Sequence, residues 1–337
     1  MTHELEVWLF SDRVGTLALV DGRLGFCYTA GWLSRPNAVA LSHSLPLRTE
    51  PFDDRTTRPF FAGLLPEGQM RRLIARQFQV SGQNDFALLD RIGGECAGAV
   101  TFLAPGQSLP TPEQTGGVLW LRDEDVVAVL DELPRRPMLA GKDGLRLSLA
   151  GAQDKLPVVF DGTRLGLPLN GTPSSHILKP PIDAVEDSVV NEGFCMALAE
   201  ALQLKPAMAS VHAVLNRPFL LVERYDRVLD AQGCRQRLHQ EDFCQALGVV
   251  PEMKYQNEGR PDLVKGPARR RMLELANSLP RAARALQSDR THGFAGNGVV
   301  ERIVALIEQR CALTLRKLSA PLSAPTSRDG DSSASPQ

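Results

Sequence analysis

The sequence predicts an α+β protein built from short antiparallel hairpins and amphipathic helices. Segments of alternating apolar residues meet at Asp21-Gly22 and at Asp161-Gly162, and Asp-Gly is a favoured dipeptide for tight hairpin turns. Other segments carry apolar residues at the spacing of a helix face, most clearly residues 188–204. At 337 residues, with 43% of them hydrophobic, the chain is long enough for more than one domain and for a buried core.

Composition excludes several broad classes of protein. No apolar run approaches the roughly 18 residues that a membrane span needs, and no basic segment followed by an apolar block opens the chain. The six cysteines are far apart in the sequence and form no Cys-x-x-Cys pair. Basic residues (38) and acidic residues (39) balance, which gives no electrostatic argument for direct nucleic-acid binding. We therefore expect a reduced, cytoplasmic protein without a membrane partner.

The first hundred residues predict a self-contained region with strands at both ends. Alternation and turn residues predict its strands over residues 5–10, 16–20, 24–28 and 98–103. Apolar residues partly at helical spacing predict helix within 58–91. A loop rich in Pro, Gly, Ser and Thr follows at 105–117. Residues 123–133 then predict a short acidic helix that ends before Pro134.

The middle third of the chain predicts a five-stranded sheet with one helix. Its elements are a hairpin of 158–160 and 165–169, a strand at 176–179, a helix at 188–204, and strands at 210–215 and 219–223. The third strand ends in Lys179, and the helix carries Glu192 in its first turns. This is the element order of a protein-kinase small lobe, in which a strand lysine contacts the nucleotide phosphates and a helix glutamate pairs with it. We expect Lys179 and Glu192 to lie within salt-bridge distance.

The stretch SLAGAQDK, residues 148–155, directly precedes this sheet. Its single glycine among alanines fits a turn into a strand as well as a phosphate-binding loop, since Gly-rich fingerprints carry two or three glycines. Lys179 alone also fits a solvated strand end, and Glu192 alone fits an acidic residue that a helix N-terminus stabilises. The three features together favour a nucleotide site.

Several sequence blocks occur in an order that is characteristic of one family. They are FFAGLLPEG (60–68), SLAGAQDK (148–155), HILKPP (176–181), VNEGFCMALAEALQL (190–204), LLVERYDR (220–227), RLHQEDFCQALG (237–248) and KYQNEGRPDL (254–263). On these blocks the chain resembles the HipA family of bacterial toxin kinases over about residues 7–263. The resemblance implies a HipA-like kinase fold with a β-rich N-terminal subdomain (1–140), a kinase-type small lobe (141–230) and a shortened, all-helical C-terminal lobe (231–318). The polar tail, 319–337, is expected to be disordered.

The resemblance also implies an ATP site that works with Mg²⁺. Lys179 would bind the phosphates, Glu223 and Tyr225 would hold the adenine at the hinge, and Gln240 would lie near the nucleotide. The phosphate loop would consist of Ala150, Gly151, Ala152, Gln153, Asp154 and Lys155. Ser148 matches the serine that these kinases autophosphorylate, which expels the loop and inactivates them.

The same resemblance implies a toxin–antitoxin module. The expected partner is a HipB-like helix-turn-helix antitoxin, which would provide the contact with DNA. The expected substrate is an aminoacyl-tRNA synthetase or a similar translation protein.

The sequence departs from the family where the catalytic groups are expected. Beyond Pro261 there is no Asp-x-His-x-x-Asn core and no later aspartate suited to hold Mg²⁺. Asp289, His292 and Asn297 occur in the right order at the wrong spacing, and the glycines around them predict a loop between two helices, 272–286 and 299–318. Three interpretations follow: an active kinase with unrecognised catalytic groups, a pseudokinase that binds nucleotide or a partner, and an internally deleted remnant.

Overall fold

The computed structural model describes residues 3–110, 117–254, 265–289 and 291–319. The chain forms two compact units. The larger contains residues 1–200 and 205–262, and the smaller contains 201–204 and 263–337. The domain boundaries expected at 140/141 and 230/231 stay predictions, and the tail expected to be disordered lies outside the described residues beyond Ser319.

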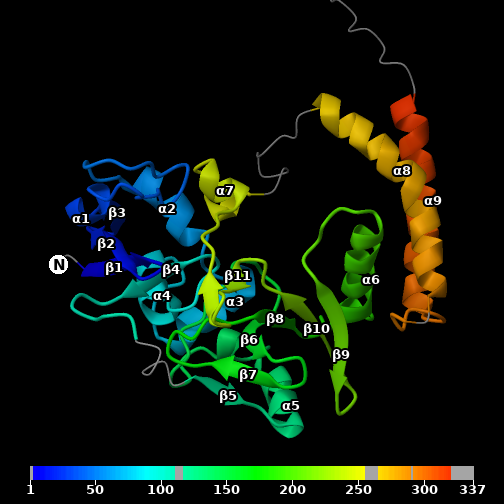
Figure 1. Cartoon of the computed structure of the whole chain (residues 1–337), viewed down its shortest axis with the longest axis horizontal. Coiled ribbons are helices and arrows are strands. Elements are labelled where there is room, and N and C mark those ends of the chain that lie inside the picture. Colours follow the sequence, from blue (N-terminus) through cyan, green and yellow to red (C-terminus); the bar gives the residue numbers. More distant parts are fainter. Residues whose placement is uncertain (1–2, 111–116, 255–264, 290, 320–337) are drawn as a thin grey trace, which may run out of the picture. The chain divides into compact units, whose positions relative to one another are not determined.

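The first sheet has four antiparallel strands in the order β3-β2-β1-β4 (Figure 1). They are β1 (His3–Leu9), β2 (Asp12–Val20), β3 (Arg23–Tyr28) and β4 (Val100–Leu103). The turn between β2 and β3 has positive φ at both central residues, 50° at Asp21 and 78° at Gly22. A two-residue hairpin turn of this kind needs that backbone conformation, so the predicted hairpin is present at the predicted turn.

The helices of this region separate where turn residues interrupt the pattern. They are α1 (Ala30–Leu33), α2 (Asp54–Ala62), α3 (Gly68–Gln77) and α4 (Asp85–Ile92). The side chains of Asp53 and Asn84 accept backbone N–H groups at the starts of α2 and α4, as N-cap residues do. Residues 58–91 therefore form parts of three helices, and the connection from α2 to α3 leaves Pro66 and Glu67 outside regular structure.

The second sheet contains all five predicted strands and one more. Its order is β5-β7-β6-β8-β10-β9, with antiparallel neighbours throughout. The strands are β5 (Val118–Trp120), β6 (Leu156–Phe160), β7 (Leu165–Pro168), β8 (His176–Lys179), β9 (Ala209–Val214) and β10 (Arg217–Glu223). The additional strand, β5, lies at one edge and is three residues long, too short to show an alternating pattern. Helix α6 (Ser188–Ala201) connects β8 to β9.

Short elements complete the larger unit. They are α5 (Asp123–Glu132), η1 (Pro137–Leu139), the hairpin of β11 (Arg227–Leu229) and β12 (Arg235–Arg237), α7 (Phe243–Ala246) and η2 (Pro251–Met253).

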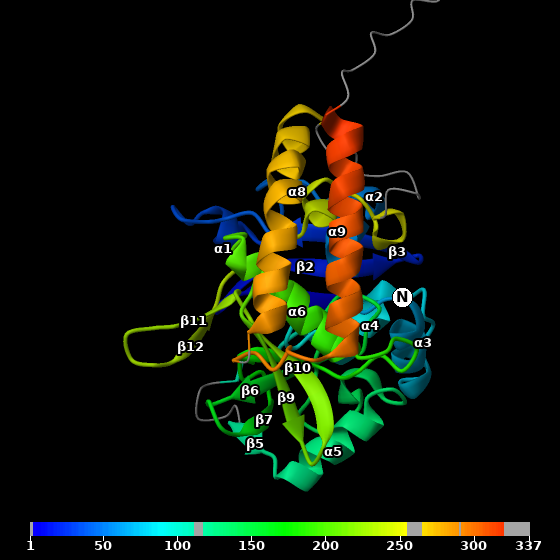
Figure 2. The same ribbon diagram turned by 90° about the vertical axis from the view of Figure 1, so that its right-hand side faces the viewer.

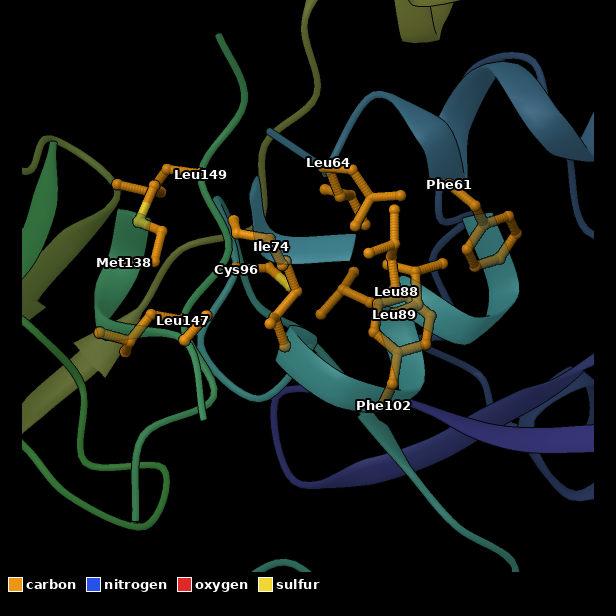
Figure 3. Packing of buried hydrophobic residues seen from close by; sticks show 14 of the residues in the cluster. Phe61, Leu64, Ile74, Leu88, Leu89, Cys96, Phe102, Met138, Leu147 and Leu149 are labelled. Atoms are coloured by element: carbon orange, nitrogen blue, oxygen red, sulfur yellow. The ribbon is translucent and has the colours of Figure 1, made fainter. Parts of the chain in front are cut away.

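One apolar core joins the first sheet, its helices and the second sheet. Figure 3 shows part of it, where Phe61 and Leu64 of the α2 region lie near Leu88 and Leu89 of α4. Leu147 and Leu149 belong to the same core and are 2% and 5% exposed. Ser148 lies between these two anchored leucines, so the segment before residues 150–155 is packed against the N-terminal region.

The smaller unit contains an antiparallel pair of helices, α8 (Lys265–Ser288) and α9 (Gly298–Ser319), which lie side by side (Figure 2). Their buried side chains include Ala276, Ala283, Val300, Val304 and Cys311. The described residues between them form the predicted loop. In the part of the chain that the structure describes, no helix combines the length and the apolar character needed to cross a membrane.

Candidate nucleotide site

A lysine from the sheet and a glutamate from the adjoining helix form the centre of the site. Lys179 is the last residue of β8, a strand that pairs with β6 on one side and β10 on the other. Its ammonium group donates a hydrogen bond to the carboxylate of Glu192 in α6. The two side chains are 21% and 32% exposed. The predicted ion pair is therefore present, and water reaches both members of it.

The loop of residues 150–155 is closed by its own lysine. The Lys155 ammonium donates to the Ala150 carbonyl at 2.5 Å. Gly151 has a φ of +104°, and a Cβ atom added there would lie 2.6 Å from the Lys155 nitrogen. The positive φ favours glycine at this position, whereas the flexible end of the Lys155 side chain could move away from a Cβ atom.

The N-terminal region contributes directly to this loop. Pro66 and Gly151 form a parallel bridge, and the Glu67 backbone N–H donates to the Gly151 carbonyl at 3.1 Å. The Glu67 carboxylate also pairs with the Lys254 ammonium at 2.6 Å. The FFAGLLPEG block thus contacts the backbone of the loop through Pro66 and Glu67. We call Lys155, Lys179, Glu192, Glu67 and Lys254 the loop cluster.

Burial and nearby charge shift the titration of two groups in this loop. Burial, helped by the neighbouring Lys179 ammonium, lowers the pKa of Lys155 to about 8. Burial also raises the pKa of Asp154, with a contribution from Asp183. A bound anion would favour the charged form of Lys155.

Ser148 lies outside the reach of water in this conformation. Its side chain is fully buried, its hydroxyl donates to the Leu64 carbonyl at 2.8 Å, and its N–H donates to the Glu95 carbonyl at 3.0 Å. A phosphate on this hydroxyl could not occupy the same place.

The expected adenine-binding residues occupy the end of β10 and the segment after it. Glu223 pairs with His176 at one end of β8, and Leu220 pairs with Lys179 at the other end. Glu223 is exposed, and Tyr225 is 72% exposed. The structure thus places Glu223 on β10, the strand that pairs with the strand of Lys179, and Tyr225 in the turn after β10. It shows no contact between this pair and the described loop cluster.

Gln240 is held against the N-terminal region. A Cβ atom added at Gly98 would lie 3.1 Å from the Gln240 backbone nitrogen and 3.2 Å from its carbonyl oxygen. Glycine at 98, with a φ of +74°, allows this approach.

Sequence reasoning missed a buried group of charges behind the hinge. We call Glu95, Arg224, Asp226, Arg227 and Arg237 the hinge cluster. Burial raises the pKa of the Glu95 carboxyl, but the three guanidinium groups more than offset this and hold the pKa below its ordinary value. The partners lie more than 120 residues from Glu95 in the sequence, so no local pattern connects them. The one available signal was the density of charge in residues 223–227, of which four are charged.

A cavity of about 1030 Å³ lies elsewhere in the larger unit. It is lined by residues from both sheets and from β12, among them Thr101, Arg146, Val159 and Arg237. Of the described residues, none of those predicted for the ATP site lines it. We therefore assign the candidate site by its chemistry and not by the size of this cavity.

Asp289 makes only local contacts among the described residues. Its carboxylate accepts the N–H of Thr291 at 2.8 Å and its hydroxyl at 2.6 Å, and pairs with His292 at 3.1 Å. Within the described ranges, no group of three or more His, Cys, Asp or Glu side chains is arranged to hold a metal ion.

An antiparallel sheet whose strand lysine pairs with a helix glutamate, beside a small-residue loop, is the arrangement of a protein-kinase small lobe. Comparison with known proteins identifies the family. The HipA N-terminal domain matches residues 5–103, and the HipA-like C-terminal domain matches residues 147–294. The chain belongs to the HipA family, as its sequence blocks predicted, and has the expected α+β, HipA-like fold.

Two curated relatives and one solved structure illustrate this likeness. The candidate kinase Y4mE of Sinorhizobium fredii is 51% identical over 262 residues, which cover 76% of this chain and 62% of the relative. The serine/threonine-protein kinase toxin HipA of Shewanella oneidensis is 29% identical over 283 residues, covering 82% and 63%. A structure of the Shewanella oneidensis HipA, HipB and operator DNA complex matches with a TM-score of 0.63 at 26% identity, covering 84% of this chain and 67% of that chain. The chain thus spans less than two thirds of the length of these curated relatives.

Proposed function

We propose that this chain binds ATP through the loop of residues 150–155, Lys179 and the hinge at Glu223 and Tyr225. The observation that supports this most directly is the Lys179–Glu192 pair. A partly buried ammonium needs a partner, and the Glu192 carboxylate both supplies it and fixes the direction of the Lys179 side chain. Kinases use a lysine–glutamate pair for this purpose.

The loop supplies the second part of the proposal. Its Lys155 is already beside the Ala150 carbonyl, and its backbone turns at Gly151 with a positive φ. A phosphate approaching this turn would meet backbone groups and two ammonium groups, from Lys155 and Lys179. Compact lysine charges suit phosphate binding.

We propose further that the bound ATP is not used for phosphoryl transfer. Transfer needs a carboxylate that positions the attacking hydroxyl and acidic ligands for Mg²⁺. The sequence beyond Pro261 lacks the Asp-x-His-x-x-Asn core of the family, and Asp289 is engaged by its own loop. In this proposal the chain is a pseudokinase of the HipA type, and Mg²⁺ contributes little to binding.

A HipB-like antitoxin is the proposed protein partner. The support is the likeness to HipA in the complex with HipB and operator DNA. DNA contact would then come through the antitoxin, in agreement with the balanced charge of this chain. The aminoacyl-tRNA synthetase expected as a substrate of the family stays a prediction.

The direct test is a calorimetric titration of the full chain with ATP, with and without Mg²⁺. Lys179→Ala is expected to abolish the binding, because it removes the central phosphate contact. Lys205→Ala, which removes an exposed lysine, is the matched control and is expected to bind like the wild type. Absence of wild-type binding at millimolar ATP would contradict the proposal.

A further inference from the structure

We infer that Glu95, a residue of the N-terminal region, positions the adenine-binding hinge, an inference that rests on the proposed ATP site. The hinge segment alternates between two environments. Glu223 and Tyr225 are exposed, whereas Arg224 and Asp226 are only 3% and 5% exposed. Each residue expected to contact adenine is thus followed by a buried charge. The contacts of the buried side chains, Arg224 and Asp226, therefore determine where Glu223 and Tyr225 lie.

The Glu95 carboxylate holds the inner side chains. It is 1% exposed, and its Oε1 atom accepts from Arg224 at 3.1 Å and from Arg227 at 2.8 Å. Its Oε2 atom accepts two hydrogen bonds from Arg237, at 2.9 and 2.6 Å. Asp226 supplies the second carboxylate, 2.7 Å from Arg224 and 2.9 Å from Arg227. Neutralising Glu95 would leave three guanidinium groups facing one carboxylate, which is costly in a buried site.

The backbone of the same residue holds the segment before the phosphate loop. The Glu95 N–H donates to the Arg146 carbonyl at 2.8 Å, and the Ser148 N–H donates to the Glu95 carbonyl at 3.0 Å. Glu95 therefore contacts both halves of the proposed site, the hinge through its carboxylate and the loop segment through its peptide groups. A substitution at this position changes the first set of contacts and leaves the second in place.

This division predicts a selective effect on the two ends of ATP. In Glu95→Gln, an amide NH₂ group replaces one carboxylate oxygen. This group faces guanidinium donors and cannot accept their hydrogen bonds. The hinge loses its anchor, while the loop and Lys179 keep theirs. The affinity for the adenosine end falls, and the affinity for the phosphate end stays the same.

The experiment compares three ligands with the full chain: ATP, adenosine and inorganic triphosphate. Glu95→Gln is expected to lower the affinities for ATP and adenosine about tenfold, which corresponds to the loss of roughly one good hydrogen bond. The affinity for triphosphate is expected to stay unchanged. Lys179→Ala is expected to lose the binding of ATP and of triphosphate and to leave the affinity for adenosine unchanged. Equal weakening of adenosine and triphosphate in Glu95→Gln, or no change in either, would overturn the inference.

Asp85→Asn is the control for a purely structural role. Asp85 is also a buried carboxylate, 4% exposed, and it pairs with two arginines, Arg58 and Arg71, in the same N-terminal region. Its loss destabilises the region without contact to the hinge. The ratio of adenosine to triphosphate affinity is expected to stay at the wild-type value in Asp85→Asn. A shift of this ratio equal to that of Glu95→Gln would reduce Glu95 to a general stabiliser and overturn the inference.

Ser174→Ala covers the case in which Glu95→Gln does not fold. The Ser174 hydroxyl donates to Glu95 Oε1 at 2.9 Å and accepts from Arg224 at 2.9 Å. Removing this hydroxyl disturbs the Glu95–Arg224 contact less than Glu95→Gln does. It is expected to lower the affinity for adenosine about threefold and to leave the affinity for triphosphate unchanged. An unchanged adenosine affinity in a folded Ser174→Ala protein contradicts the inference. Failure of the wild type to bind ATP would instead refute the proposed function itself.

Discussion

Two clusters of opposite charges in the larger unit differ in how far water reaches them. In the loop cluster, Lys179 and Glu192 keep a fifth and a third of their side chains exposed. In the hinge cluster, the Glu95 and Arg224 side chains are each 1% exposed. Water and ligands can therefore reach both members of the Lys179–Glu192 pair, whereas Arg237, 16% exposed, is the most exposed side chain of the hinge cluster.

The composition of the two clusters agrees with this difference. The loop cluster contains three lysines, whose flexible point charges suit a phosphate that comes and goes. The hinge cluster contains three arginines, whose planar groups hold carboxylates in fixed geometry. This difference supports the proposals that the loop cluster binds the phosphates and that the hinge cluster fixes the position of the hinge.

The largest expected effect is on the free energy of unfolding, and it is expected to be larger for the hinge cluster than for the loop cluster. Glu95→Ala is expected to lower the free energy of unfolding by about 3–5 kcal/mol, because it leaves buried guanidinium groups without their carboxylate. Lys179→Ala is expected to cost only about 1 kcal/mol, as for partly exposed pairs. Urea unfolding of both variants, followed by circular dichroism, measures the difference. Equal losses would show that the two clusters have the same role.

The second prediction concerns the stabilising contribution of Glu95 at acidic pH. The folded pKa of Glu95 lies below its ordinary value, so its stabilising contribution is complete above the unfolded pKa of about 4.3 and is lost as pH falls toward the folded pKa. The stability advantage of the wild type over Glu95→Gln is expected to be constant above about pH 5 and to shrink below about pH 4. Unfolding curves at a series of pH values test this, and an advantage that grows in acid contradicts it.

The third prediction concerns the titration of Lys155, in the loop cluster, at alkaline pH. With a pKa of about 8, Lys155 loses its proton in the free protein between pH 7 and 9, and a bound phosphate restores the charge. ATP affinity is expected to fall about tenfold over this range, with proton uptake on binding. Calorimetry in two buffers of different ionisation enthalpy measures the uptake.

The matched variant for this prediction is Lys155→Arg, which stays charged at all these pH values. It is expected to bind ATP without the pH dependence. The same pKa implies that the free wild-type protein gains stability from about pH 8 to the ordinary lysine pKa of 10.5, because the unfolded chain binds the additional proton there. If the ATP affinity of Lys155→Arg still depended on pH, another titrating group would be responsible for this dependence.

The sequence predicted the loop cluster better than the hinge cluster for a physical reason. Lys179 and Glu192 lie 13 residues apart on consecutive elements, and the element order of a kinase small lobe predicted that they pair. Glu95 meets Arg224 across 129 residues, through the packing of the N-terminal region on the second sheet. Periodicity describes which face of an element is buried, and it contains no information on such distant partners.

The same limit applies to the strands. The five that were predicted show alternation or end in recognisable turns, whereas β5 has three residues that join an edge through pairing with β7. A strand this short is defined by its neighbour. The motif blocks supplied the family and the expected ATP residues, and the structure adds that the FFAGLLPEG block contacts the loop through Pro66 and Glu67.

The smallest expected effect concerns catalysis, where we expect none. Beyond Pro261 the acidic residues are Asp262, Glu274, Asp289, Glu301, Glu308, Asp329 and Asp331. Glu308 of α9 pairs with Arg284 of α8, and Glu274 pairs with Arg271 within α8. Asp289 accepts hydrogen bonds from Thr291 and pairs with His292. None of these three is offered to a metal or a hydroxyl in the described structure.

Incubation of the purified protein with labelled ATP and Mg²⁺ or Mn²⁺ is therefore expected to leave Ser148 unmodified by mass spectrometry, and Asp289→Asn is expected to behave like the wild type. The burial of Ser148 alone does not explain such a result, because an active relative must expose its serine to modify it. A Ser148→Ala control shows whether any label belongs to that hydroxyl. Label on Ser148 that disappears in Asp289→Asn would make Asp289 the catalytic base, and would turn the loop cluster from a binding site into half of an active one.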